Sequence, residues 1–340
     1  MRRLASMICV VALAGCGGSG GTSGSVTPPA APTGTLFVAN ADGINSFAVT
    51  ASGNTFPLRQ ITGLSAHTDG ANGIDDTQGF SSRTIRGLAA ANTVGTVGAL
   101  MVSVAHMQQP GSQVWEFAPT ATGAADAMII STGAGVDYGL TPAIGIASAP
   151  GRAGYDVLPG IFYVARTNPP SAYRAAGPNG CCPSSRGIAA DADGNVYVSS
   201  SFPNEVAVYS ATTTTGTATP MRTIATASLP GPMSLGPDGM LYVVERATGA
   251  QSPSTIEVFA PGASSPARVL GPFSGDMPVV SVALDNQNEL YVAQAQADVN
   301  DQPTGPGSIT VFAPGASGSA TPIRILQNPI QKMVAIAIGR

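Results

Sequence analysis

The stretch Thr255–Leu270 reads TIEVFAPGASSPARVL, and about fifty residues later Ser308–Leu326 reads SITVFAPGASGSATPIRIL. Each copy places an apolar run before a Pro-Gly turn and a second apolar run after it. Val, Ile and Phe favour β-strands, whereas Pro and Gly favour turns. A near-copy at this distance indicates that the chain is built from a repeated β-structural unit.

The repeat extends outward from these two copies into four strand-like segments per unit. One segment follows an L-Y-V pattern at Leu36–Asn40, Leu100–Val104, Phe162–Arg166, Val196–Ser200, Leu241–Glu245 and Leu290–Gln294. We predict that this segment is the second strand of each unit. Six units of four strands and about fifty residues are typical of propeller blades. The sequence therefore predicts an all-β fold, a six-bladed β-propeller of four-stranded blades, over residues 35–340.

The pattern GIA-D--GN-YV, then I-VF-PGA, then P-R-I resembles the repeat of NHL-type six-bladed propellers in the NHL and gluconolactonase-like superfamily. This resemblance implies an interaction platform, because NHL-type propellers commonly serve that role. Gluconolactonase-type relatives hold one divalent metal with Glu, Asn and Asp ligands, and residues of those types here are Glu245, Asn40, Asp285 and Asp191. Streptogramin-lyase-like relatives depend on a catalytic His, for which His106 is the candidate.

The two ends of the repeat region predict how the ring closes. MVAIAIGR, Met333–Arg340, has the pattern of a first strand with no second strand after it, whereas Thr35 begins a second strand with no first strand before it. We therefore expect the C-terminal strand to complete the first blade, which removes an exposed sheet edge.

The N-terminal residues predict a signal peptide and a lipid anchor. An apolar run, Leu4–Leu13, follows two arginines and leads into Leu-Ala-Gly-Cys, which resembles the lipobox of bacterial lipoproteins. We predict a lipoprotein signal peptide at 1–15, lipidation of Cys16, and a flexible Gly/Ser/Pro tether at 16–34. An ordinary secretory signal is the alternative. Gly17 after the cysteine resembles the rule for outer-membrane sorting, so we expect a cell-envelope protein facing the periplasm or the cell surface.

The charge and cysteine content limit the partners. The chain has 15 Lys and Arg against 19 Asp and Glu, a net charge of −4, and loss of Arg2 and Arg3 with the signal peptide makes it −6. The scattered arginines form no basic stripe for nucleic acid. We expect a monomer. Cys181 and Cys182 are adjacent and form either a vicinal disulfide or two free thiols.

Long connections are predicted on one face of the propeller, and binding sites tend to lie in such loops. His67, His106, Cys181 and Cys182 fall in or beside these connections. The residue that ends each predicted second strand also varies. We interpret Asn40, His106, Arg166, Glu245 and Gln294 as a candidate polar rim around a ligand. Solvated strand ends are the alternative interpretation.

Metal-binding and catalytic motifs are weak. In Asp191–Asn195 the glycine comes fourth, whereas an EF-hand loop needs it sixth, so these residues predict a turn. Asp69–Asp76 is an acidic segment, either a Ca²⁺ site or a polar loop. Two histidines do not make a zinc site, and no G-x-S-x-G motif occurs. We predict no catalytic, cofactor-binding or metal-binding residue.

Three functions follow from this sequence. The first is a binding or scaffolding module for a protein, glycan or small ligand. The second is a metal-dependent hydrolase or lyase of the gluconolactonase or streptogramin-lyase-like type. The third is a structural envelope protein.

Overall fold

A computed structural model describes the propeller unit, Pro32–Arg340, in most of its length. The described residues are 33–40, 43–62, 83–90, 99–106, 112–125, 128–132, 145–148, 154–158, 161–164, 172–173, 187–201, 203–210, 219–247, 252–297 and 303–339. The predicted signal peptide and tether lie outside these residues, apart from Thr33 and Gly34.

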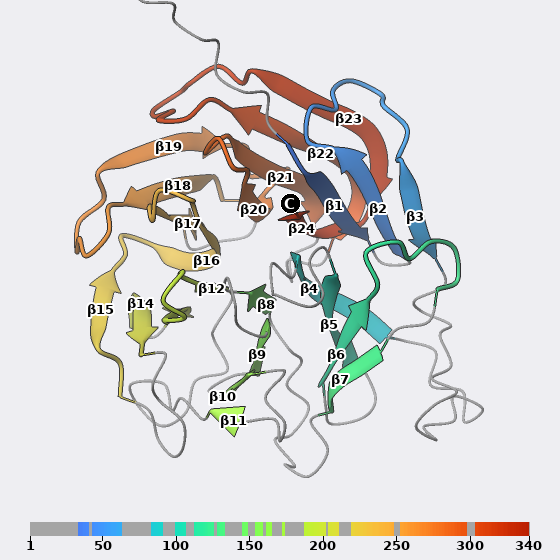
Figure 1. The fold of residues 1–340 in the computed structure, drawn as a ribbon. Helices are drawn as coiled ribbons and strands as arrows, with labels where there is room; N and C mark the ends of the chain where they lie inside the picture. The colour runs from blue at the N-terminus through green and yellow to red at the C-terminus, as the bar shows by residue number, and fades with distance from the viewer. Residues whose placement is uncertain are drawn as a thin grey trace, which may run out of the picture. The chain divides into compact units, whose positions relative to one another are not determined.

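The described strands form six four-stranded antiparallel sheets (Figure 1). The strands of the first three sheets all lie before residue 180, with one exception, the C-terminal strand in the first sheet. The first sheet has the order β24-β1-β2-β3 and combines β1 (Thr35–Asn40), β2 (Gly43–Ala48) and β3 (Arg59–Thr62) with β24 (Met333–Gly339). The second sheet contains β4 (Arg83–Ala90), β5 (Leu100–His106), β6 (Ser112–Phe117) and β7 (Met128–Thr132). The third contains β8 (Gly145–Ser148), β9 (Gly154–Leu158), β10 (Ile161–Val164) and β11 (Ala172–Tyr173).

The remaining three sheets follow in chain order, each with its strands side by side in sequence. The fourth contains β12 (Ile188–Ala190), β13 (Val196–Ser201), β14 (Asn204–Tyr209) and β15 (Arg222–Ala225). The fifth contains β16 (Leu229–Leu235), β17 (Leu241–Arg246), β18 (Ser254–Phe259) and β19 (Arg268–Phe273). The sixth contains β20 (Val279–Leu284), β21 (Leu290–Ala297), β22 (Pro303–Phe312) and β23 (Arg324–Gln331).

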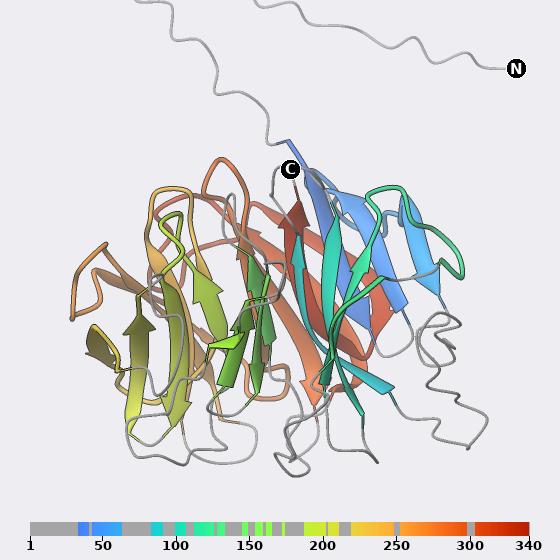
Figure 2. The same cartoon turned by 60° about the horizontal axis from the view of Figure 1, so that its bottom comes forward.

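The first strand of each sheet lies innermost and contacts the first strand of the next sheet. These contacts run from β24 to β4, β8, β12, β16 and β20 and return to β24, so the sheets close a ring (Figure 1). Figure 2 shows the strands of the sheets running between the two faces of this ring. The protein is an all-β propeller, as the repeat predicted.

The C-terminal strand closes the ring by joining the first sheet. β24 pairs antiparallel with β1, with Ile338 opposite Leu36 and Ile336 opposite Val38. β24 also contacts β20 and β4, the inner strands of the sheets on either side. The predicted closure is therefore confirmed, and the first sheet is assembled from both ends of the propeller sequence.

The core lies between neighbouring sheets because successive side chains of a strand point to opposite faces. On β17, Leu241 and Val243 pack against the fourth sheet, whereas Tyr242 and Val244 pack against the sixth. The first, fifth and sixth sheets each contribute to two inter-sheet clusters. This is why one repeat alone cannot bury its apolar residues and why the units must stack.

Left-handed residues recur at equivalent positions of the turns. In the turns between first and second strands, Gly194, Gly239 and Asn288 have φ of 82°, 77° and 61°. Asparagine is among the few residues other than glycine that adopt this conformation readily. In the turns between third and fourth strands, Gly262 and Gly315 have φ of 76° and 78° and follow prolines, as the repeated Pro-Gly turn predicted.

The connection between third and fourth strands also joins neighbouring sheets. In three of these connections a left-handed glycine bonds the fourth strand of the preceding sheet. Gly53, Gly123 and Gly318 bridge in parallel to Leu326, Ile61 and Leu270, respectively. We call this contact the glycine clasp. Because the fourth strand is the outer edge of its sheet, the clasp covers an edge that would otherwise be open.

The third sheet corrects part of the sequence alignment. Phe162–Arg166 was aligned with the second strands, but β10 is the third strand of its sheet and pairs with both β9 and β11. The second strand is β9, whose sequence GYDVL lacks the L-Y-V pattern. Third strands of this propeller also carry alternating aromatic and aliphatic residues, so the FYV of β10 imitates a second strand. This part of the alignment was wrong.

Candidate functional site

Two of the residues predicted to end the second strands, Glu245 and Gln294, face the seams between sheets. Glu245, at the end of β17, is only 2% exposed, and its Oε2 accepts a hydrogen bond of 3.0 Å from the backbone N–H of Ser228. Gln294, at the equivalent position of β21, donates from Nε2 to the carbonyl of Met277 over 3.0 Å. In both sheets this side chain therefore holds the connection that leads into the first strand.

The structure says less about the other members of the predicted rim, Asn40, His106 and Arg166. Asn40 is half-buried at the end of β1, where the register with β24 shifts. His106 ends β5, but its side chain lies outside the description. Arg166 lies outside the described residues, and it follows a third strand, not a second. The rim as a ligand site stays a prediction.

Glu245 has a second carboxyl beside it, which sequence reasoning missed. Val243 of β17 lies opposite Glu257 of β18, and Glu245 lies opposite Thr255. Glu245 and Glu257 are therefore diagonal neighbours on the face that packs against the fourth sheet. Glu257 is 7% exposed, and Oε1 of Glu245 is buried with no donor among the described residues. A proton held between the two carboxyls would supply that missing hydrogen bond.

The electrostatics of this seam favour such a proton. Burial is the main cause that raises the pKa of Glu245, followed by the hydrogen bond and the charge of Glu257, and the backbone N–H of Ser228 opposes the shift. The result is a pKa of about 8 for Glu245. Glu245 thus stays largely protonated at neutral pH. Since both side chains are buried, the pair can respond to pH but offers no group to a bound substrate.

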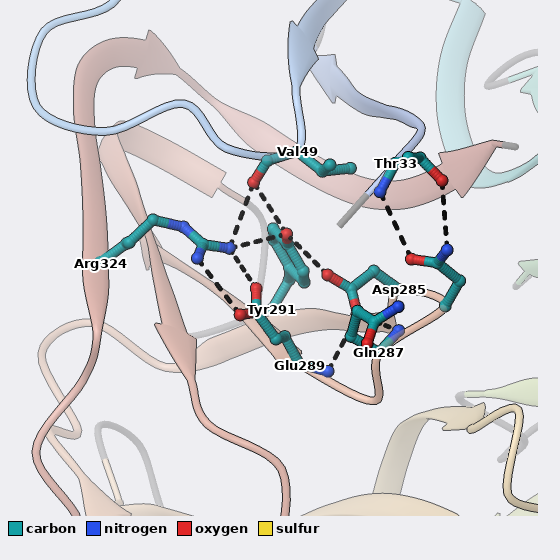
Figure 3. A network of polar contacts seen from close by, with 8 residues as sticks. Thr33, Val49, Asp285, Gln287, Glu289, Tyr291 and Arg324 are labelled. Carbon is teal, nitrogen blue, oxygen red and sulfur yellow. Dashed lines mark hydrogen bonds and ion pairs between the residues drawn. The ribbon is translucent and has the colours of Figure 1, made fainter. Parts of the chain in front are cut away.

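A second polar cluster lies where the sixth sheet meets the first, at the closure of the ring (Figure 3). The hydroxyl of Tyr291 lies 2.8 Å from the carbonyl oxygen of Val49 and 3.2 Å from Oδ2 of Asp285. Arg324 donates from Nη2 to the Tyr291 hydroxyl over 3.0 Å and to the Val49 carbonyl over 3.2 Å, and it pairs with Glu289. Val49 belongs to the first sheet's turn, so these bonds cross the closing seam.

Burial governs the protonation of this cluster. Burial, and then the Asp285 carboxylate, raise the pKa of Tyr291 above its ordinary value of 10.0. Burial also raises the pKa of Asp285, although the N–H groups of Glu289 and Gln287 oppose the shift. Tyr291 therefore stays protonated and can donate across the seam.

The arginine of this cluster is repeated, and the sequence carries the signal. A P-x-R motif begins four of the fourth strands, at Arg59, Arg222, Arg268 and Arg324. Arg222 donates to the carbonyl of Ala263 over 3.0 Å, and Arg59 donates to that of Pro119, each in the next sheet's turn. Three of the four repeated arginines, Arg59, Arg222 and Arg324, thus make an inter-sheet contact, which explains their recurrence without a ligand.

We expect Tyr291→Phe to destabilise the protein by about 1 to 3 kcal/mol, because Oδ2 of Asp285 and Nη2 of Arg324 lose the hydroxyl as a partner, and the Val49 carbonyl is left with the hydrogen bond from Arg324. Tyr242→Phe is the matched control, since that hydroxyl accepts one hydrogen bond of 2.9 Å from Arg268 within its own sheet. The control should lose about 1 kcal/mol or less. Urea unfolding of both variants measures the difference, and equal losses would contradict a special role for the closing seam.

The candidate metal ligands do not come together. Asp191 and Asp285 lie in turns between first and second strands, whereas Glu245 lies at the far end of a second strand. Both oxygens of Asp191 accept hydrogen bonds from Asn195, of 2.8 and 2.9 Å, which confirms the predicted turn. Among the described residues no three His, Cys, Asp or Glu side chains cluster in a way that could hold a metal ion.

Several predicted sites fall on residues that the structure does not describe. These are the lipidation site Cys16, the adjacent Cys181 and Cys182, His67, and the acidic segment Asp69–Asp76. In the described part of the chain, no helix is long and apolar enough to cross a membrane.

Comparison with known proteins supports the fold alone. The sequence matches no family model and no curated protein. A Bacteroides caccae protein of unknown function has a similar structure, with a TM-score of 0.54 at 10% identity, over 91% of this chain and 99% of that chain. The β-propeller domain of Cps50 (Swd1) from Myceliophteria thermophila gives 0.47 at 13% identity, over 90% and 89% of the two chains. YCF48 bound to D1 peptide gives 0.42 at 14% identity, over 88% and 83%.

Proposed function

We propose that this chain is a membrane-anchored propeller lipoprotein that binds a partner through the face formed by its long connections. The observation that carries the proposal is the unequal length of the connections between sheets. Those leading into β4, β8 and β12 are long, at residues 63–82, 133–144 and 174–187. Those leading into β16, β20 and β24 are short, at 226–228, 274–278 and residue 332. Long loops on a rigid scaffold commonly carry binding function.

The three long connections belong to consecutive sheets and leave from the same face, because each follows a fourth strand. The second strands end at this face too, because second and fourth strands of an antiparallel sheet run in the same direction. His67, Cys181 and Cys182 belong to these connections, and His106 ends a second strand at that face. The side chains of Glu245 and Gln294 form hydrogen bonds within the seams. These facts support the connections, more than the strand ends, as the binding surface.

The finer parts of the proposal rest on sequence. The lipobox-like residues before Cys16 support a lipid anchor, and Gly17 supports the outer membrane. The repeat supports a six-bladed, NHL-type interaction platform. The partner is a protein, a glycan or a small ligand, and the scattered arginines argue against nucleic acid.

The anchor is tested by fractionating cells that make the wild-type protein or Cys16→Ser. We expect the wild type in the membrane fraction and the variant released or unprocessed, with a lipid mass on the wild-type N-terminal cysteine. An unmodified thiol at residue 16 of the mature wild-type protein would refute the anchor.

The binding face is tested with a photo-crosslinking amino acid in the native envelope. Substitutions at Asp69 and Asn179 probe the long connections, and substitutions at the exposed turn residues Asp193 and Asp238 are the matched controls on the opposite face. We expect discrete crosslinked products from the first pair only. Crosslinks from neither pair, or equally from both, would contradict the proposed face.

A further inference from the structure

The glycine clasp has the same hydrogen-bond geometry at three seams. Gly123 donates its N–H to the carbonyl of Gln60 over 2.7 Å and accepts from the N–H of Thr62 over 2.8 Å. Gly318 bonds Val269 and Gly271 in the same way, over 2.7 and 2.9 Å. Gly53 repeats the pattern on the carbonyl of Ile325 and the N–H of Gln327, over 2.7 and 2.8 Å.

The conformation of the clasp explains why it uses glycine. Gly53, Gly123 and Gly318 have φ of 62°, 66° and 56°, in the left-handed region. A Cβ at any of them would meet no atom within 4 Å, so space is not the reason. A clasp therefore consists of a short extended segment with a left-handed small residue that offers one N–H and one carbonyl to the edge.

The outer edge of β15 differs from the other three edges. The next sheet's connection, 260–267, is shorter than its counterpart 313–323 and has no glycine after its Pro-Gly turn. It reaches β15 only through the Arg222 side chain, which bonds Ala263. Among the described residues no backbone bridge to β15 occurs.

The repeat identifies which groups of β15 are left open. Arg222 and Ile224 correspond to Arg59 and Ile61, so Thr223 and Ala225 correspond to the clasped residues Gln60 and Thr62. Thr223 and Ala225 are exposed, whereas Ile224 between them is fully buried. The Thr223 carbonyl and the Ala225 N–H therefore point outward with no partner in the described part of the chain. An open pair of this kind can accept another strand.

We propose that the edge of β15 binds an extended peptide segment of a partner protein. The segment runs parallel to β15 and places a glycine between Thr223 and Ala225, as the internal clasps do. Met221, which is 55% exposed just before β15, offers an apolar contact to a neighbouring side chain of that segment. This site lies on the outer edge of the ring and is independent of the long-connection face.

The geometry argues for a peptide and against a second copy of the chain. Two β15 edges would pair strand against strand, and neither would supply the left-handed glycine that every observed clasp uses. The clasp also needs only two main-chain hydrogen bonds. We therefore expect moderate affinity and a preference for glycine at one position of the peptide.

The test uses a labelled peptide with the sequence of residues 313–321, APGASGSAT, which forms the clasp on β19. Fluorescence anisotropy measures its binding to the full-length protein. Ala225→Pro removes the outward N–H without removing a ladder hydrogen bond, and Thr223→Ala is the control that keeps the main chain. A second peptide carries Pro in place of the clasp glycine.

We expect saturable binding that weakens at least tenfold in Ala225→Pro and at least tenfold with the proline peptide, and that persists in Thr223→Ala. Binding that is absent, or equal for Ala225→Pro, overturns the proposal. Concentration-dependent dimers that Ala225→Pro abolishes would also overturn it, because the edge would then belong to a second copy. Urea unfolding of Ala225→Pro checks that the variant is folded.

Discussion

Deletion of Met333–Arg340 is expected to abolish cooperative folding of the propeller. The deletion removes all of β24 and with it the buried side chains of Met333 and Ile336, which are 0% and 3% exposed. It also exposes the edge of β1 along its whole length. The hydrogen bond of 3.1 Å from the N–H of Ile336 to Oγ of Ser281 on β20 is lost as well. Domains of this kind are stable by only about 5 to 15 kcal/mol, and loss of a central strand is of that order.

Circular dichroism during heating and light scattering measure the outcome. We expect no cooperative transition, or aggregation through the opened edge of β1. Removal of Arg340 alone is the control and should leave the melting temperature unchanged. An unchanged transition after the full deletion would mean that β24 does not close the ring.

Two point variants keep this test decisive if the truncated chain cannot be purified. Ile336 is buried in the seam between the sixth and first sheets, and Ile338 is only partly buried on the same strand. We expect Ile336→Ala to cost about 2 to 5 kcal/mol and Ile338→Ala clearly less. Equal costs would show that burial on β24 does not determine ring stability.

The local signals of the sequence were sufficient for the fold. Val, Ile and Phe runs separated by Pro-Gly turns predicted strands and turns, and the unpartnered run at Met333–Arg340 predicted the closure. The prediction of the third sheet's second strand was wrong because that strand, GYDVL, contains Gly and Asp, which are uncommon in strands. The more strand-like FYV of β10 was aligned in its place.

The site was harder to predict, because it depends on which face a side chain takes and on the register between strands. Glu245 was interpreted as part of an open rim, but it shares a face with Leu241 and Val243, which pack between sheets. Counting the alternation from Leu241 would have placed it in the seam. Its proximity to Glu257 could not be predicted, since that requires the register of β17 against β18.

The repeated arginines are a feature that could have been predicted from the sequence, because the P-x-R motif is visible there. Arg59, Arg222 and Arg324 occupy the same place in the P-x-R motif, and each bonds the next sheet's turn. A charged residue repeated in a protein of low charge indicates a structural contact that recurs at several seams. The clasp glycines, by contrast, needed the structure, because glycine is abundant throughout this chain.

The carboxyl pair of Glu245 and Glu257 is expected to make stability fall as the pH rises from about 5 to 8. The pKa of Glu245 is about 8 in the folded protein, against 4.5 for an ordinary glutamate. Between these values the folded state holds a proton that the unfolded state has released. Stability from this group is therefore fully present below about pH 4.5, and it is lost by up to about 1.4 kcal/mol per pH unit as the pH rises.

Glu245→Gln should remove this dependence and stabilise the protein at pH 8. The amide oxygen still accepts from Ser228, and the amide N–H can donate to the Glu257 carboxylate without a proton. The sixth sheet supports this substitution, because it carries Gln294 at the same repeat position. The reverse change, Gln294→Glu, places a carboxylate against the Met277 carbonyl, so it should cost about 1 to 3 kcal/mol at pH 8 and less at pH 5.

Urea unfolding at pH 5, 6, 7 and 8 measures both effects as differences from the wild type, so that other titrating groups cancel. We expect the stability difference between Glu245→Gln and the wild type to grow with pH. The difference between Gln294→Glu and the wild type should grow in the destabilising direction. A difference for Glu245→Gln that stays constant across this range would show that the two carboxyls share no proton, and Oε1 of Glu245 would then need another donor.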